Sequence, residues 1–556
     1  MKNPHAIGHH IVTILLHDYF HRGVFKQVVG EKQWSRFEGR LDKNVDAALE
    51  LLGSFNIKGT FFTLGWIADN DPAIIKRIVA EGHEIADAGY SVRSIGEMTP
   101  AQFRDDLRRS RRALENAGAN KIIGFRSAYK WLDKNQFWAL DVLREEGYLY
   151  DASYKPSLMG AKHRFAFEYK TKNGFLREFP TATRSIFGVN VPISGGSYLR
   201  LLPHWMMYRY FSHWNKNIPA PFVLYFHPWE LDPDQPVINA VGNLAKMKQY
   251  SNLGKMKGIL PRYFREGKFQ SISQYLGIDL EFPIKKRSDV PSVGAFIGQC
   301  DEDAVGVNIE ALTPVSIAIP CYNESDSIPY LVKALEELRC AALKFYRFTF
   351  IFVDDCSSDN TFEMLQKTFG ARKDCKIIRH EKNKGVAGAL MTGIIAADTE
   401  IVCTIDADCS YDPLELIKMI PLLEQNSADM VTASPYHKNG FVFGVPEWRL
   451  FLSRSLSNMY HFVLHHKLST YTSCFRVFRR SMVMKTAVKY NEFRGVIELL
   501  AKIDLQGGRL IEYPTTLHSR IFGFSKMKVL KTIAGHLGLL TEIYRLKNVS
   551  KRRLSK

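Results

Sequence analysis

The sequence lacks several features that would assign it to a simple class of protein. None of the first 299 of its 556 residues is a cysteine, and the eight cysteines that follow form no C-x-x-C pair, so we expect reduced, mostly buried thiols. No run of about 20 apolar residues exists, which argues against a membrane-spanning helix. The polar start and the short apolar run at 11–16 are unlike a secretory signal, so a cytoplasmic location is expected.

The composition is that of a globular protein with an excess of positive charge. Hydrophobic residues make up 46% and charged residues 24%, which excludes a disordered chain, a collagen and a coiled-coil rod. The net charge of +18 favours anionic partners: nucleic acid, acidic lipid or phosphorylated substrates. No zinc finger, RRM-like aromatic segment or base-reading basic helix is present, so we expect no nucleic-acid partner.

Two modules are indicated by the uneven distribution of two residue types. Seven of the eight tryptophans precede residue 230, whereas every cysteine follows residue 299. We predict a first domain at 1–283, a linker at 284–313 and a second domain at 314–556. The linker combines a basic cluster, Pro, Gly and an acidic cluster with weak periodicity.

In both halves, short apolar strands alternate with amphipathic helices. This alternation predicts parallel sheets covered by helices, with sites at the carboxyl ends of the strands. The expected helices are 42–55, 72–81, 100–117 and 135–146 in the first half, and 327–338, 360–369 and 386–397 in the second.

Three predicted strands of the second half end in acidic residues. The strand that contains IAIP leads to Glu324, FIFV leads to Asp354 and Asp355, and IVCTI leads to Asp406 and Asp408. At one edge of a sheet these five carboxylates would repel one another unless a cation joined them. Oxygen ligands in a D-x-D arrangement suit Mg²⁺ or Mn²⁺, and Mg²⁺ prefers one or two carboxylates together with substrate phosphates. The sequence therefore predicts a site for a metal and a diphosphate.

Six segments of the second half carry a family resemblance. They are IPCYNES at 319–325, VDDCSSDNT at 353–361, NKGVAGAL at 383–390, IDADCSYDP at 405–413, TSCFRVFRR at 472–480 and RIFGFSK at 520–526. In this order they resemble family 2 glycosyltransferases of the GT-A fold, in particular the dolichol-phosphate or polyprenyl-phosphate sugar synthases. The resemblance implies a Rossmann-like α/β domain that transfers a sugar from a nucleotide sugar, with inversion at the anomeric carbon.

The resemblance also implies a role for individual residues. The nucleotide sugar would be bound by Pro320, Tyr322, Glu324, Asp354, Asp355, Lys384, Asp406 and Lys526. Asp406 and Asp408 would hold the metal, and Ser473 and Arg476 would lie near the acceptor. Arg520 would neutralise phosphate. The catalytic set would thus be Asp408, Arg520 and Glu498, the last as the base if the acceptor is a sugar hydroxyl.

The second half departs from that branch at three places. Thr470 and Tyr471 stand where the branch usually has an aspartate, Cys474 replaces a glycine, and Pro435 replaces an arginine. These departures affect the acceptor more than the donor. Both a lipid phosphate and a glycan stay open as acceptors.

The first half carries a second set of motifs. They are LHDYFH at 16–21, GTFFTLGWIA at 59–68, GHEIADAGY at 82–90, GFRSAY at 124–129, YDASYKP at 150–156 and FHPWELDP at 226–233. They resemble the NodB-type polysaccharide deacetylases, which implies a (β/α) barrel. Asp18 matches the metal aspartate of that family, and Arg126 and His227 match residues that orient groups and transfer protons. His17 replaces an acid.

The histidines of the deacetylase metal site are absent from the matching positions. They fall on Ala88 and Val92, which have no ligand atoms, so no metal is expected there. The remnant cleft would contain His17, Asp18, Arg126 and His227, and with Trp66 and Trp229 it would bind a glycan.

The main hypothesis is a glycosyltransferase of surface polysaccharide or glycolipid synthesis with an inactive deacetylase-like domain. One alternative is a bifunctional deacetylase and glycosyltransferase, and another is a non-catalytic glycan-binding scaffold. Basic amphipathic segments at 448–464 and 524–556 fit peripheral contact with an anionic membrane at its inner face, although a solvated basic surface is an equally simple explanation.

Overall fold

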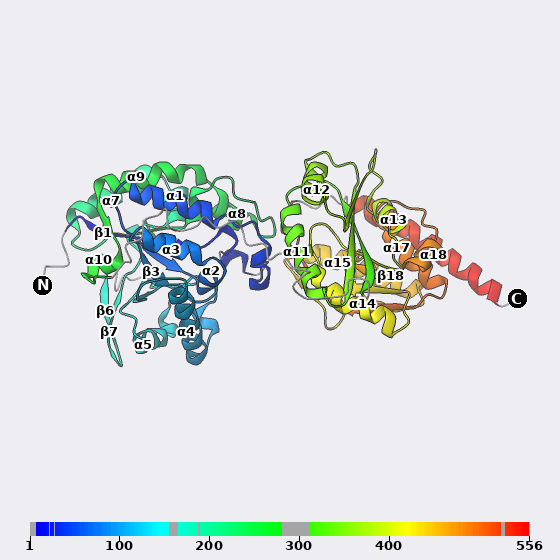
Figure 1. Cartoon of the computed structure of the whole chain (residues 1–556), viewed down its shortest axis with the longest axis horizontal. Helices are drawn as coiled ribbons and strands as arrows, with labels where there is room; N and C mark the ends of the chain where they lie inside the picture. Colours follow the sequence, from blue (N-terminus) through cyan, green and yellow to red (C-terminus); the bar gives the residue numbers. More distant parts are fainter. Residues whose placement is uncertain are drawn as a thin grey trace. The chain divides into compact units, whose positions relative to one another are not determined.

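A computed structural model describes residues 7–21, 23–26, 28–154, 165–186, 189–280, 312–523 and 529–554. The chain divides into two compact units, which are described separately (Figure 1). Unit 1 comprises Met1–Trp34, Gly39–Val237 and Gly242–Phe296, and unit 2 comprises Ser35–Glu38, Ile238–Val241 and Ile297–Lys556. Lys526 and nearly all of the predicted linker lie outside the described residues, so the domain limits stay a prediction.

The sheet of unit 1 is built mainly from parallel strands. Its order is β10-β1-β2-β3-β4-β5-β7-β6, with β11 also paired to β1, and only β6 is antiparallel to its neighbour. The strands are β1 (His9–Leu16), β2 (Thr60–Thr63), β3 (Glu84–Asp87), β4 (Gly124–Phe125), β5 (Tyr150–Asp151), β6 (Phe167–Thr171), β7 (Gly174–Glu178), β10 (Val223–Phe226) and β11 (Lys268–Gln270).

Two backbone hydrogen bonds join the ends of this sheet into a ring. The chain that leaves β7 reaches Ala182, whose carbonyl accepts a hydrogen bond from the N–H of Ile193 at 3.0 Å. The neighbouring carbonyl of Ser194 then accepts from the N–H of Tyr225 in β10 at 2.9 Å. The predicted (β/α) barrel of the first half is thereby confirmed. The separate hairpin of β8 (Thr183–Ile186) and β9 (Val189–Pro192) lies between these two points.

Helices cover the strands of unit 1. Of the four that the sequence predicts, three begin within one residue of the expected position, and the fourth begins at Trp138 instead of residue 135. Thr99 caps one of them, because its side chain accepts from the N–H of Gln102 while the Gln102 side chain accepts from the N–H of Thr99. The α-helices are α1 (Leu41–Gly53), α2 (Gly65–Asn70), α3 (Pro72–Ala80), α4 (Pro100–Asn116), α5 (Trp138–Glu145), α6 (Gly196–Leu201), α7 (His204–Asn217), α8 (Asn243–Tyr250), α9 (Met256–Glu266) and α10 (Ile272–Leu276).

The main sheet of unit 2 has seven strands in the order β14-β13-β12-β15-β18-β16-β19. They are β12 (Thr313–Cys321), β13 (Tyr346–Asp354), β14 (Cys375–Arg379), β15 (Ile401–Thr404), β16 (Met430–Ser434), β18 (Arg476–Arg479) and β19 (Leu510–Pro514). β18 runs antiparallel to both neighbours, so the expectation of a purely parallel sheet is wrong there. β17 (Phe441–Phe443) and β20 (Thr516–His518) form a second, two-stranded sheet.

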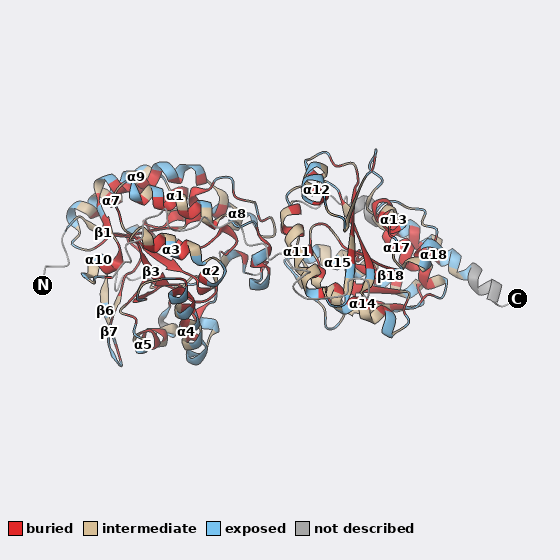
Figure 2. Cartoon of the chain, viewed as in Figure 1, coloured by how far each residue is buried: buried red, intermediate tan, exposed pale blue. Residues whose placement is uncertain are grey.

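The helices of unit 2 complete a Rossmann-like α/β domain, as predicted. They are α11 (Ile328–Ala342), α12 (Thr361–Phe369), α13 (Val386–Ile395), α14 (Leu416–Gln425), α15 (Glu447–Val463), α16 (Arg480–Met484), α17 (Phe493–Leu505) and α18 (Val529–Leu554). Strands β12, β13, β15, β16 and β18 are largely buried (Figure 2), so their apolar side chains form the core of the unit. Polar residues follow the ends of several of these strands. Among the described residues, no helix is long and apolar enough to cross a bilayer.

The cysteines follow the sequence expectation with one exception. Six described cysteines carry free thiols, and four of these are buried. Cys340 is disulfide-bonded, so the expectation of fully reduced cysteines is wrong at this residue.

Candidate functional site

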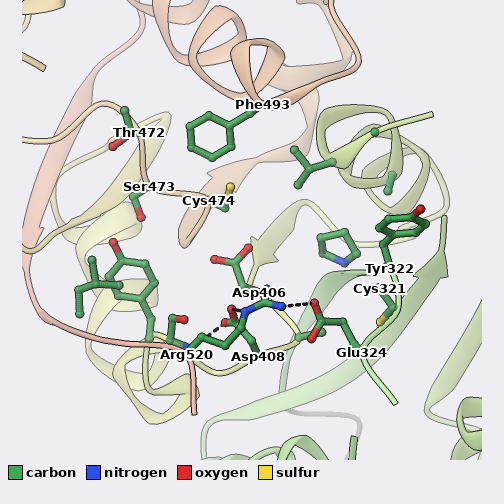
Figure 3. A pocket seen from close by; sticks show the side chains of 18 of the residues that line it. Cys321, Tyr322, Glu324, Asp406, Asp408, Thr472, Ser473, Cys474, Phe493 and Arg520 are labelled. Atoms are coloured by element: carbon green, nitrogen blue, oxygen red, sulfur yellow. Dashed lines mark hydrogen bonds and ion pairs between the residues drawn. The ribbon is translucent and has the colours of Figure 1, made fainter. Parts of the chain in front are cut away.

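The acidic strand ends of unit 2 meet because their strands are neighbours. β12 pairs with β13 on one side and with β15 on the other, and all three run parallel. Their carboxyl ends therefore face the same edge of the sheet. Glu324, Asp355, Asp406 and Asp408, four of the five carboxylates that the sequence predicts at this edge, line one pocket there. Figure 3 shows Glu324, Asp406 and Asp408 in this pocket.

This pocket encloses about 580 Å³ and has two chemically different walls. The strand ends supply an acidic wall. The other wall is rich in hydroxyl groups and comes from the chain around β16, α15 and the segment before β18, together with Tyr411 from the loop after β15. Its polar members are Tyr411, Tyr436, Ser453, Thr470, Thr472 and Ser473.

The acidic wall carries unbalanced negative charge. Burial, and after it the charge of Asp408, raise the pKa of the Asp406 carboxyl well above its ordinary value, while Arg520 acts in the opposite direction. A bound cation would relieve this repulsion.

Arg520 is the cationic side chain that reaches into this cluster. Its Nε donates to Oδ2 of Asp408 and its Nη1 donates to Oε1 of Glu324, both at 2.8 Å (Figure 3). Among the described residues that line the pocket, Arg520 is the only one with a positive side chain, against five acidic ones.

Asp355 fixes the loop that precedes α13. Its Oδ1 accepts from the N–H of Lys384 at 2.8 Å and its Oδ2 from the N–H of Gly385 at 2.7 Å, and His380 Nδ1 lies 2.7 Å from Oδ1. The loop thereby brings Asn383 and Gly385 to the pocket, whereas the Lys384 side chain is exposed and not part of the lining.

Asp354 has another place, although it is next to Asp355 in the sequence. It is fully buried, and its Oδ2 lies 3.2 Å from Nε of Arg379 on the neighbouring strand β14. It does not line the pocket. Alternation of side chains along a strand explains why only one of the two aspartates faces the site.

Pro320, Tyr322 and Ser473 lie in the pocket lining, as expected. Tyr322 remains 39% exposed, so part of its side chain is accessible to a ligand. Ser473 lies in the hydroxyl-rich wall, where its Oγ accepts from the N–H of Phe475 at 3.1 Å.

Arg476 and Glu498 do not line this pocket. The Arg476 guanidinium is buried and donates to the carbonyls of Val496 at 2.6 Å and Tyr471 at 2.9 Å. It therefore holds backbone together, and these contacts do not support the expected role at the acceptor.

Glu498 likewise binds backbone. Its carboxylate accepts from the N–H groups of Lys489 and Tyr490 at 2.9 to 3.1 Å, and Lys502 lies 2.6 Å away. Because α17 directs this residue into the protein, its contacts do not support the expected role as a base.

Several lining residues were not identified from the sequence. They are Asn383, Tyr411, Tyr436, Ser453, Thr472, Glu492, Phe493 and Leu517. Asn383, Tyr411 and Thr472 lie inside segments that carry the family resemblance, so those segments could have indicated them. The others come from helices, turns and strand β20, whose orientation depends on tertiary packing.

In unit 1, the expected remnant residues lie at the ends of the barrel strands. His17 follows β1, and its ring centre is 5.6 Å from that of His227, which follows β10. Asp18 accepts from the N–H groups of Tyr19 at 2.8 Å and Arg40 at 2.7 Å, so both its oxygens already have partners. Burial raises the pKa of Asp18 to about 6 and lowers that of His17 to about 3.

Apolar residues occupy the two positions where the resemblance places the histidines of the deacetylase family. Ala88 and Val92 are both buried, and Val92 lines a cavity of about 300 Å³ with His21 and Trp34. Trp229, expected in a glycan cleft, is fully buried and stacks on His227 with ring centres 5.2 Å apart. It cannot form a wall of an open cleft in this arrangement.

Two buried acids accompany Arg126 in the barrel. Asp151 ends β5 and Glu178 ends the neighbouring β7, and burial raises the pKa of each carboxyl. Arg126 is itself buried, with its guanidinium carbon 4.4 Å from the centre of the Tyr225 ring. The sequence motif contained Asp151, but nothing in the sequence marked Glu178.

Family models match three stretches of the chain. Residues 316–486 match glycosyl transferase family 2, residues 34–148 match polysaccharide deacetylase, and residues 153–277 match a domain of unknown function, DUF3473. The chain thus carries a polysaccharide deacetylase domain followed by a family 2 glycosyltransferase domain, as its motifs predict.

Curated relatives match about two fifths of the chain. The dolichol-phosphate mannosyltransferase of Pyrococcus furiosus is 29% identical over 234 residues, which are 42% of this chain and 63% of that protein. The undecaprenyl-phosphate 4-deoxy-4-formamido-L-arabinose transferase of Proteus mirabilis is 29% identical over 233 residues, 42% of this chain and 68% of that protein. The chain therefore spans less than two thirds of the first of these relatives.

One solved structure with a bound donor is that of a mannosyltransferase from Pyrobaculum calidifontis, in complex with GDP-Man and Mn²⁺. The match covers 43% of this chain and 74% of that chain at 17% identity, with a TM-score of 0.28. A likeness of that size supports no conclusion about function.

Proposed function

We propose that unit 2 transfers a sugar from a nucleoside-diphosphate sugar to a polyprenyl phosphate. The single observation that carries this proposal is the convergence of Asp406, Asp408, Glu324 and Arg520 on one pocket. The names of the two relatives, both polyprenyl-phosphate sugar transferases, support the choice of acceptor. A polyprenyl carrier resides in a bilayer, so the proposal includes peripheral contact with an anionic membrane.

The pocket provides separate places for the parts of a nucleotide sugar. Pro320, Tyr322 and the loop held by Asp355 line the side that would take the nucleoside. The hydroxyl-rich wall offers neutral donors and acceptors that suit a sugar ring. Arg520 would move from the carboxylates to the diphosphate and stabilise the negative charge of the leaving group.

The same carboxylates fit a divalent cation. Among the described residues, no three His, Cys, Asp or Glu side chains are arranged to hold a metal ion. Asp406 and Asp408 would therefore hold Mg²⁺ or Mn²⁺ only together with the substrate diphosphate, which is the ligand set that Mg²⁺ prefers. The ion would supply charge neutralisation at the leaving phosphate.

A polyprenyl phosphate would attack without help from a general base. Its phosphate oxygen is already an anionic nucleophile, which agrees with the absence of Glu498 from the pocket lining. A hydroxyl acceptor would require a base at this place.

The test is transfer from a panel of UDP- and GDP-linked sugars to a polyprenyl phosphate with Mn²⁺ present. We expect turnover in the wild type and a loss of about a hundredfold or more in Asp408→Asn. Asp398→Asn is the matched control, because the Asp398 side chain is 80% exposed, pairs with surface Lys376 and does not line the pocket. Transfer that is unchanged in Asp408→Asn, or absent with every donor, would contradict the proposal.

For unit 1 we propose a non-hydrolytic role. Ala88 and Val92 offer no metal ligand, and Asp18 is committed to two backbone N–H groups. The bifunctional alternative predicts acetate release from an N-acetylated glycan and its loss in His227→Ala. We expect no acetate release from the wild type or from His227→Ala.

A further inference from the structure

Helix α15 (Glu447–Val463) has two faces of opposite character. Its inner face carries Ser457 and Tyr460, which are buried, and Ser453, which lines the pocket. Its outer face carries large apolar side chains at helical spacing: Trp448, Phe451, Met459 and Phe462. The helix thus joins the wall of the candidate active site to the surface of unit 2.

The outer face is unusually exposed for its chemistry. The exposed fractions are 53% for Trp448, 70% for Phe451, 39% for Met459 and 80% for Phe462. Because water contact with apolar surface is unfavourable, contiguous exposed aromatics usually mark a binding surface.

The chain before α15 extends this apolar character. Phe441 and Phe443 on strand β17 are 60% and 46% exposed, and their spacing of two residues places them on the same side of the strand. We call these six side chains, Phe441, Phe443, Trp448, Phe451, Met459 and Phe462, the aromatic face.

The charges on α15 are suited to an anionic partner. Arg449 and Arg454 are the basic residues of this helix and Glu447 is its only acid, while the whole chain has a net charge of +18. Aromatic residues combined with basic ones are typical of helices that lie in the interface of an anionic bilayer.

We propose that the aromatic face inserts into the surface of an anionic bilayer. The proposal deepens the proposed function, on which it rests: a polyprenyl phosphate keeps its tail in the membrane and must present its phosphate to the pocket. A helix with Ser453 in the pocket wall and Phe451 and Phe462 in the lipid places the pocket next to the bilayer surface.

The first experiment measures binding to lipid vesicles by co-sedimentation. The double variant Phe451→Ser with Phe462→Ser removes two side chains that are already exposed, so the fold is retained, and a thermal unfolding curve checks this. We expect its partition to vesicles that contain an anionic lipid to fall at least about tenfold. Phe462→Ser alone is a milder second variant with a smaller loss.

The matched control is Trp205→Ser, since Trp205 is also a large apolar residue, is 72% exposed, and belongs to unit 1. Its vesicle binding should equal that of the wild type. Equal binding by the wild type and the double variant would overturn the proposal. So would self-association of the wild type in the absence of lipid if the double variant did not self-associate, because this face would then bind a second copy of the chain. Weaker binding to purely zwitterionic vesicles would support the role of the basic residues.

A second measurement separates this proposal from the proposed function. Transfer to a polyprenyl phosphate embedded in vesicles should fall in the double variant, whereas transfer to a short, water-soluble prenyl phosphate should not. An equal fall with both acceptors would overturn the membrane role of the aromatic face. A wild type that binds vesicles but transfers to neither acceptor would contradict the proposed function and leave the lipid contact supported.

Discussion

Arg520 lies where a cation would have to bind in the proposed reaction. It donates two hydrogen bonds of 2.8 Å, one to Asp408 and one to Glu324, and so offsets part of their negative charge. The other oxygen of Asp408 already accepts from the N–H of Ser410 at 2.9 Å. A divalent ion would therefore compete with a guanidinium for the same carboxylate.

We expect Arg520→Gln to bind Mn²⁺ without nucleotide about tenfold more tightly than the wild type, because one positive charge has left the site. The same variant should bind UDP or GDP with Mn²⁺ more weakly, because the diphosphate has lost a cationic partner. The electron paramagnetic resonance signal of free Mn²⁺ measures both affinities.

Arg509→Gln serves as the control for this measurement, since Arg509 is exposed and does not line the pocket. It should behave like the wild type in both titrations. If Arg520→Gln changed the affinity for Mn²⁺ alone and the affinity for the nucleotide with Mn²⁺ in the same direction, Arg520 would not move from the carboxylates to the diphosphate when the nucleotide binds.

Glu498 provides a second prediction at this scale. Glu498→Ala leaves the N–H groups of Lys489 and Tyr490 and the charge of Lys502 without their carboxylate. We expect the free energy of unfolding to fall by about 1–3 kcal/mol, with little change in turnover per folded molecule. Denaturant titration and a transfer assay measure the two quantities, and a large loss of turnover at unchanged stability would restore the catalytic assignment.

At the scale of elements, the sequence predicted the strands that build the site because their ends combine an apolar run with acids. Asp406 and Asp408 follow β15, and Asp355 follows β13, as expected. The antiparallel β18 was not predicted, because the hydrophobic pattern of a four-residue strand does not indicate whether it pairs parallel or antiparallel to its neighbours. The roles of Arg476 and Glu498 depend on which way β18 and α17 face, and only tertiary packing determines this.

The turn before α13 offers a test at the element scale. Gly385 has a φ of +86°, and a Cβ there would lie 2.8 Å from the carbonyl oxygen of Asn491. Gly385→Ala should therefore lower the free energy of unfolding by about 1–3 kcal/mol. It should also weaken nucleotide binding, since the N–H of Gly385 donates the hydrogen bond by which Asp355 holds this turn at the pocket.

Gly507→Ala is the matched control for that turn. Gly507 also has a positive φ, of +84°, but a Cβ there would meet no atom within 4 Å. Thermal unfolding of both variants separates the backbone effect from the contact. If the two variants lost the same amount of stability, the contact between the new Cβ and Asn491 would contribute nothing to the loss in Gly385→Ala.

At the scale of the whole molecule, family motifs predicted both folds, but not how the first site has changed. The motifs indicated Asp18, Arg126 and His227, and they predict that Ala88 and Val92 stand where the family has metal ligands. They could not reveal a buried pair such as Asp151 and Glu178, whose partners come from separate strands. A pair of this kind is visible only once the register of the barrel is known.

The stability of unit 1 should depend on pH through its buried histidines, of which His83 is the simplest case. His83 Nδ1 accepts from the N–H of Gly59 at 3.0 Å, and burial, with a smaller contribution from Lys58, lowers its pKa from 6.5 to about 3. Between these two values the unfolded chain binds a proton that the folded chain does not. The free energy of unfolding therefore falls as the pH falls from about 6.5 towards 3.

His83→Asn keeps an acceptor for Gly59 but cannot be protonated, so its loss of stability between pH 7 and pH 5 should be about 2 kcal/mol smaller than in the wild type. Urea titrations at the two pH values measure the difference, and equal losses in both proteins would mean that His83 is protonated as easily in the folded chain as in the unfolded one.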